Sequence, residues 1–80
     1  MSLSPATLQV LDAIMRLRMA RKIVTVRAIG RAINQTATTT WISIRLRRLR
    51  EEGLIDWEAG SNGTIRPLVR FIPADMLEES

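Results

Sequence analysis

The apolar residues of this 80-residue chain recur at helical spacing in three stretches, and an alternating pattern follows them. The first stretch begins at Ser4-Pro5, because serine caps free N–H groups and proline fits the first position of a helix. Its end is predicted near residues 19–22, where basic side chains suit the negative end of a helix. This helix has a wide apolar face, formed by Leu8, Val10, Leu11, Ile14, Met15 and Leu17.

A second helix is predicted over residues 26–33, with Thr25 as its N-cap. Glycine inside a helix costs about 1 kcal/mol relative to alanine, so Gly30 favours a close approach of the third helix there. The β-branched pair Ile23-Val24 is expected to be extended and able to add a short strand to a sheet. One face of this helix is apolar, with Val26, Ile29 and Ile33.

A third helix is expected after a tight turn at residues 34–37. Thr38 is its predicted N-cap, and Gly53 is predicted to end it because glycine adopts positive φ without penalty. Its core positions are Ile42, Leu46 and Leu49. The opposite face of the helical wheel carries Thr40, Ser43, Ile44, Arg47, Arg48 and Glu51.

Alternating apolar and polar residues over 54–58 predict a strand, and residues 64–72 predict a second strand that pairs with it. Between them, residues 59–63 hold two glycines and an asparagine, a turn composition. Pro67 lacks an N–H donor, so we expect it at an edge or a bulge. The predicted fold class is α+β, mainly α. It is a winged helix-turn-helix of three helices with a two- or three-stranded β-hairpin wing, as one domain over residues 1–80 with a tail at 73–80.

The residue types argue against an enzyme. The chain has no cysteine and no histidine, which excludes disulfides, thiolate or imidazole metal sites and histidine-activated nucleophiles. We therefore expect no metal and no cofactor. No apolar run approaches the roughly 18–20 residues that span a bilayer, and no signal peptide is visible. We expect a soluble, cytoplasmic, nucleoid-associated protein with no membrane contact.

Charge is distributed unevenly along the chain. The net charge is +4, yet residues 16–50 contain ten cations and no acidic residue, whereas residues 51–80 contain seven acids and two arginines. Eleven of the twelve cations are arginine, whose planar fork suits phosphate. A solvated surface is the ordinary explanation of a charged run, but 35 residues without an acid favour a polyanionic partner.

The helix-turn-helix pattern makes duplex DNA the expected polyanion. Residues 38–52 are predicted to enter the major groove, where short hydroxyls, an isoleucine and arginines meet base edges or phosphates. Trp41 is expected either to cover the edge of the core or to stack on DNA, and Trp57 to pack across the hairpin. The wing tip is expected either to touch DNA or to be simply a turn. The candidate DNA-binding residues are Thr25, Arg27, Thr38, Thr39, Thr40, Trp41, Ser43, Ile44, Arg47, Arg48, Ser61, Asn62 and Arg66.

Several of these residues belong to a recognisable pattern. The second helix reads Thr25-Val26-Arg27-Ala28-Ile29-Gly30, and the first and third helices add Leu3-Ser4, Val10-Leu11-Asp12, Ile14, Thr38, Ile42, Leu46, Leu49 and Gly53-Leu54-Ile55. Over about residues 3–70 the chain thereby resembles the N-terminal DNA-binding domain of LexA-type repressors. The resemblance implies a winged-helix repressor whose base-contacting positions are Thr40, Trp41, Ser43 and Ile44, with Thr38 as the cap.

The chain departs from that family in three respects. The turn at 34–37 is one residue longer and lacks the usual glycine, and the loop at 21–24 is shorter. These 80 residues hold no counterpart of the family's self-cleaving C-terminal domain, so we expect the resemblance to imply neither autoproteolysis nor dimerisation through that domain. Different residues occupy the base-contacting positions, so the operator sequence is not transferable.

Two other functions stay open at this point. In the first, the winged helix is a protein-interaction module of a transcription or replication complex, and its exposed apolar residues contact a partner protein. RNA binding is disfavoured, because one phenylalanine and two tryptophans offer few stacking surfaces. For the DNA-binding regulator, a homodimer on a palindromic site is a possible assembly.

Overall fold

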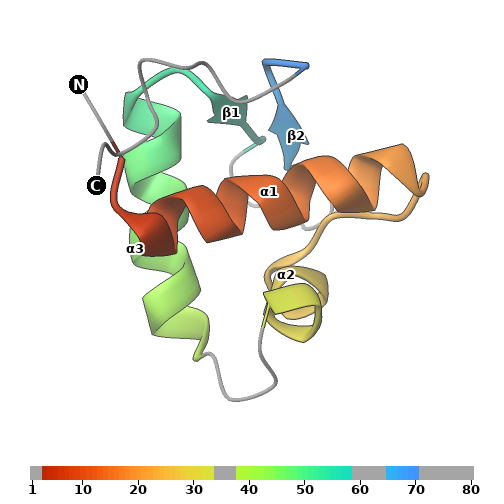
Figure 1. The fold of residues 1–80 in the computed structure, drawn as a ribbon, viewed down its shortest axis with the longest axis horizontal. Coiled ribbons are helices and arrows are strands. Elements are labelled where there is room, and N and C mark those ends of the chain that lie inside the picture. Colours follow the sequence, from red (N-terminus) through yellow and green to blue (C-terminus); the bar gives the residue numbers. More distant parts are fainter. Residues whose placement is uncertain (1–2, 34–37, 59–64, 71–80) are drawn as a thin grey trace.

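Three helices and one antiparallel hairpin make up the computed structural model, which describes residues 3–33, 38–58 and 65–70 (Figure 1). This is the α+β, mainly helical, winged-helix layout that the sequence predicts. The predicted turn at 34–37, the wing turn at 59–63 and the tail at 73–80 lie outside the described residues. The elements are α1 (Pro5–Met19), α2 (Val26–Ile33), α3 (Thr39–Glu51), β1 (Ile55–Asp56) and β2 (Arg66–Pro67).

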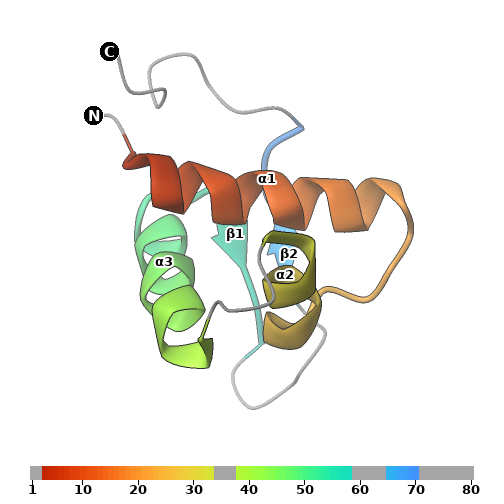
Figure 2. The ribbon, with the colours of Figure 1, turned by 60° about the horizontal axis from the view of Figure 1, so that its bottom comes forward.

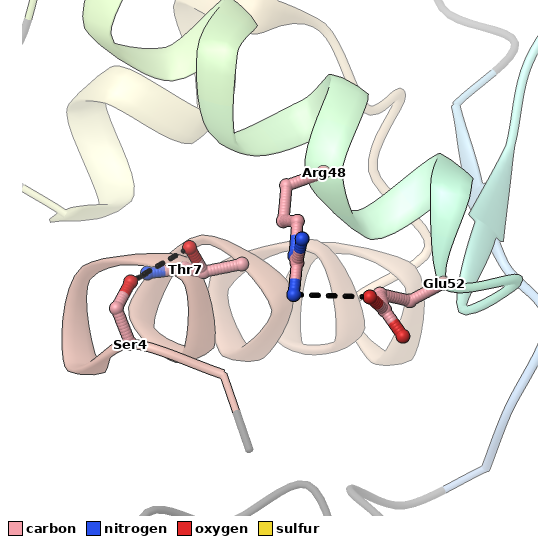
Figure 3. Close-up of polar contacts among 4 residues, drawn as sticks. All are labelled: Ser4, Thr7, Arg48 and Glu52. Atoms are coloured by element: carbon pink, nitrogen blue, oxygen red, sulfur yellow. Dashed lines mark hydrogen bonds and ion pairs between the residues drawn. The ribbon is translucent and has the colours of Figure 1, made fainter. Parts of the chain in front are cut away.

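All three helices begin at a hydroxyl-bearing cap, as predicted. The hydroxyls of Ser4, Thr25 and Thr38 accept hydrogen bonds from the backbone N–H three residues later, at 3.3, 3.0 and 3.1 Å. Each cap satisfies one of the N–H groups that a helix start leaves without a partner. At α1 the Ser4 hydroxyl also lies 2.9 Å from that of Thr7, a buried polar group (Figure 3).

The helices α1 and α3 end in the same way. At the end of α3 the Leu54 N–H donates to the Leu49 carbonyl at 3.0 Å, across Gly53 with φ +74°. At the end of α1 the Lys22 N–H donates to the Leu17 carbonyl at 2.9 Å, and the residue that turns the chain is Arg21 with φ +56°. Both are closures in which a left-handed residue follows the helix. The predicted stop at Gly53 is confirmed, and an arginine fills the equivalent position after α1.

The helices and the hairpin share one hydrophobic core. α1 lies across the other elements and contacts α2, α3 and β2 (Figure 2). Gly30 is buried within α2, and α2 contacts α3. The core consists of Leu3, Val10, Leu11, Ala13, Ile14, Val24, Ile29, Ile42, Leu46, Leu49, Leu54, Ile55 and Ile65.

The pair Ile23-Val24 before α2 lies outside the helices and strands, so it does not add the third strand that the sequence left open. The N–H of Lys22 closes α1 and the hydroxyl of Thr25 caps α2, so two residues remain between them. Val24 is buried in the core, whereas Ile23 is 73% exposed. The sheet of the described residues therefore has two strands, not three.

Within residues 54–58 and 65–70 each strand of the hairpin has two residues, so β1 is shorter than the predicted stretch 54–58. Ile55 pairs with Pro67 and Asp56 pairs with Arg66. A proline in the ladder cannot donate, and the next bond comes from the Leu68 N–H to the Leu54 carbonyl at 2.8 Å. The predicted edge position of Pro67 is confirmed, because both strands of a two-stranded sheet are edges.

Candidate nucleic-acid interface

The helix α3 has one buried and one exposed face, as its sequence predicts. Ile42, Leu46 and Leu49 are buried in the core. The face away from the core exposes side chains of three kinds: hydroxyls, one large apolar group and charged groups. Its exposed residues are Thr40, Ser43, Ile44, Arg47, Arg48 and Glu51.

Exposed hydroxyls gather at the start of α3. Thr39 and Thr40 are exposed in the first turn, and Ser43 follows one turn later. Thr38 is exposed too, but its hydroxyl accepts the backbone N–H of Trp41 at 3.1 Å. Thr38 therefore fixes where the helix begins, whereas the three later hydroxyls are available to a ligand. This is the end of a recognition helix that reaches base edges in helix-turn-helix proteins.

Most arginines of α3 are engaged within the protein. Arg48 pairs with Glu52 at 3.1 Å (Figure 3), and the Arg45 guanidinium lies 4.7 Å from the centroid of the Trp41 ring. Arg50 pairs with Asp56 and stacks on Trp57. Within the described part of the chain, Arg47 is the arginine of α3 that forms no ion pair or ring contact. Arg47 is therefore better placed than Arg48 to meet an external anion.

Trp41 is half-buried and packs against the core, the first of its two predicted roles. The stacked Arg45 covers part of its ring. Arg45 and Trp41 lie side by side on α3, so a ligand that reaches Trp41 would meet Arg45 as well. Sequence reasoning placed Arg45 on a neighbouring face of the helix for phosphates or guanine, but it did not predict the contact with Trp41, although the spacing of four residues is the signal for it.

Arg50 fastens the hairpin to α3 through three contacts. Its Nε lies 3.3 Å from the Asp56 carboxylate, one Nη donates to the Trp57 carbonyl at 3.4 Å, and its guanidinium lies 4.3 Å from the centroid of the Trp57 ring. Trp57 itself is half-buried against the core. These contacts hold the end of β1 against the last turn of α3.

Removing these contacts is expected to destabilise the fold modestly. Arg50→Ala should lower the free energy of unfolding by about 1 kcal/mol, since exposed ion pairs and cation–π contacts each contribute up to about that much. Urea denaturation followed by tryptophan fluorescence measures the change. Arg47→Ala is the matched control and should leave stability unchanged within error. Equal effects of the two substitutions would show that the Arg50 contacts do not hold the hairpin.

The start of α2 carries the other predicted contacts. Thr25 is half-buried and uses its hydroxyl as the cap, whereas Arg27 is exposed. Both line an open cleft of about 380 Å³ between the end of α1 and α2, together with Leu17, Lys22, Ala28, Arg31 and Ala32. Sequence reasoning omitted Lys22 and Arg31 from the site. The acid-free run of residues 16–50 was the signal that includes them.

The predicted wing contacts are described only in part. Ser61 and Asn62 lie outside the described residues. Arg66 is exposed on β2, opposite Asp56 in the ladder. The hairpin therefore presents one of its three predicted contact residues on a described segment.

Among residues 3–33, 38–58 and 65–70, no three histidine, cysteine or acidic side chains are grouped so that they could hold a metal ion. No helix in those ranges is long and apolar enough to cross a membrane. Comparisons with protein-family models, curated proteins and solved structures gave no match. The function therefore has to be argued from the residues of this chain.

Proposed function

We propose that this protein binds double-stranded DNA sequence-specifically through the exposed face of α3 and regulates transcription, most simply as a repressor. The observation that carries the proposal is the first half of α3. It exposes Thr39, Thr40, Ser43 and Ile44 without an acidic residue, with Arg47 one turn further on. Hydroxyls bond phosphates or base edges, and an exposed isoleucine contacts thymine methyls in the major groove.

The proposed role is one of binding and not of catalysis. The resemblance of residues 3–70 to LexA-type DNA-binding domains supports the same reading, and it remains part of the proposal. In that reading the base-contacting positions are Thr40, Trp41, Ser43 and Ile44. Thr38 contributes indirectly, because its hydroxyl caps α3 and so fixes where the base-contacting residues begin.

Selection of ligands from a pool of random DNA duplexes tests the proposal. We expect one enriched sequence, bound more weakly as salt rises, with a log–log slope of about 0.9 per phosphate contact. A palindromic sequence would indicate a homodimer. No enrichment above background at low salt would overturn the proposal.

Two substitutions on α3 separate base reading from backbone contact. Thr40→Ala should reduce the preference for the selected duplex over an unrelated one, because a base contact contributes about 1–3 kcal/mol of discrimination. If Arg47 contacts a phosphate, Arg47→Ala should weaken binding to both duplexes alike. Fluorescence anisotropy with the two duplexes measures both effects. Glu51→Gln, on the same face but at the far end of the helix, is the control and should not weaken binding.

A protein-interaction module is the second candidate, and exposed apolar side chains favour it. Met19 is 85% exposed and Ile23 73% exposed, where α1 ends and the chain turns toward α2. In that case Met19→Ser and Ile23→Ser should abolish binding to the protein partner, while Arg47→Ala leaves it intact. A protein partner whose binding is lost in Arg47→Ala but unchanged in Met19→Ser and Ile23→Ser would exclude a partner contact through Met19 and Ile23.

A further inference from the structure

The cations that have no partner in the described structure are concentrated away from α3. Arg18, Arg21 and Lys22 are exposed at the end of α1, and Arg27 and Arg31 are exposed on α2. Within the described ranges, none of these five forms an ion pair or a ring contact. We call these five residues the α1–α2 corner. In contrast, three of the four arginines of α3 are engaged inside the protein.

Three of the five residues of the α1–α2 corner line the cleft described above. Lys22, Arg27 and Arg31 line it with no acidic residue, and Leu17, Ala28 and Ala32 supply an apolar surface beside the cations. A nucleic acid backbone has the matching chemistry, since charged phosphates alternate with the less polar faces of the sugars. Arg27 and Arg31 are also four residues apart on one helix, a spacing at which like charges repel. A bound polyanion would relieve that repulsion.

The backbone of Arg21 is a second, independent observation. Its φ of +56° lies in the left-handed region, where a side chain other than that of glycine is disfavoured. The equivalent position after α3 is occupied by Gly53, with the same pattern of closing hydrogen bonds. An arginine at this position lowers the stability of the fold, and its side chain forms no described contact in return. A contact with a ligand outside the chain accounts for it.

We propose that the α1–α2 corner binds backbone phosphates of the same DNA duplex that α3 reads, with Arg21 as a direct phosphate contact. This inference rests on the proposed function, and it assigns the anchoring of the duplex to residues outside the recognition helix. The size of the protein permits the arrangement. Its longest dimension is 32 Å, close to one helical turn of B-DNA at about 34 Å.

The test compares three variants and one charge-matched control variant with the native protein in duplex binding over a range of salt concentrations. Arg21→Gly should weaken binding roughly tenfold and reduce the log–log salt slope by about 0.9. The loss should be the same on the selected duplex and on an unrelated one, because phosphates carry no sequence. At the same time Arg21→Gly should raise Tm by roughly 2–8 °C, because glycine relieves the left-handed backbone.

The other variants make the result specific. Arg21→Lys keeps the charge and should retain binding within about twofold without raising Tm. Arg31→Gln removes a cation from the cleft wall with no change in backbone strain, and it should lower the salt slope as Arg21→Gly does. Arg70→Gln is the charge-matched control. The segment after β2 lies on the opposite side of α1 from α2 (Figures 1 and 2).

The outcomes separate this inference from the proposed function. If the native protein binds no duplex at low salt, the proposed function itself fails. If the native protein binds but Arg21→Gly and Arg31→Gln weaken binding no more than Arg70→Gln does, the corner is not an anchor. A Tm that rises in Arg21→Gly without any loss of affinity likewise overturns the role of Arg21.

Discussion

Ile42→Ala is expected to lower the free energy of unfolding by about 2–5 kcal/mol, a large part of the stability of a domain of this size. Ile42 is 1% exposed, and it lies on the face of α3 that packs into the core. Truncation removes buried methyl groups and leaves a cavity that neighbouring helices can fill only in part. Thermal unfolding followed by circular dichroism measures the loss.

Ile44→Ala, two residues further along the same helix, is the matched control. Ile44 is 58% exposed, so its truncation should change stability by less than about 0.5 kcal/mol. In the proposed function it should instead weaken the preference for the selected duplex, because the thymine contact is lost. The two isoleucines thus separate folding from binding. Similar losses of stability in both variants would contradict the placement of α3 against the core.

Gly53→Val is expected to cost about 2 kcal/mol, because a β-branched residue is strongly disfavoured at positive φ. The φ of Gly53 is +74°, and a Cβ added there would meet no atom within 4 Å. The cost is therefore one of backbone conformation and not of steric collision. Urea denaturation of the purified variant measures it.

Gly53→Asn provides the comparison that isolates this cause. Asparagine tolerates the left-handed region better than other side chains, so its cost should be clearly smaller than that of valine. The Cβ that both side chains share would meet no atom within 4 Å. Equal losses for valine and asparagine would mean that the closing turn of α3 depends on something other than the φ of Gly53.

The parts of the fold that depend on local interactions were predictable from the sequence. The caps at Ser4, Thr25 and Thr38 involve a hydroxyl and an N–H three residues away, so the residue type alone indicates them. The buried faces of the helices follow from spacing in the same way. Alternation predicted where the hairpin strands lie but overestimated the length of β1, because it reports the direction of side chains and not backbone pairing.

Which arginines of α3 form ion pairs or ring contacts within the protein was not predictable from the sequence. Arg47 and Arg48 both have a glutamate four residues later, yet Arg48 forms the pair with Glu52, and no pair of Arg47 with Glu51 is present among the described residues. Glu52 is held half-buried at the end of α3, whereas Glu51 is exposed. The contacts of Arg50 require β1 to fold back along α3, which no local pattern encodes. The exposed hydroxyls of the candidate site are therefore those that the sequence predicts. Which of its arginines are available to a ligand became clear only from the structure.

The contact between α1 and β2 has a consequence for how the chain folds. It joins a segment near the beginning of the described chain to one near its end. Bringing such distant segments together costs chain entropy, and the contact contributes its stabilising free energy only after that cost has been met. The final packing of α1 therefore requires that the intervening elements be in place already. We therefore expect the domain to gain and lose its structure as one cooperative unit.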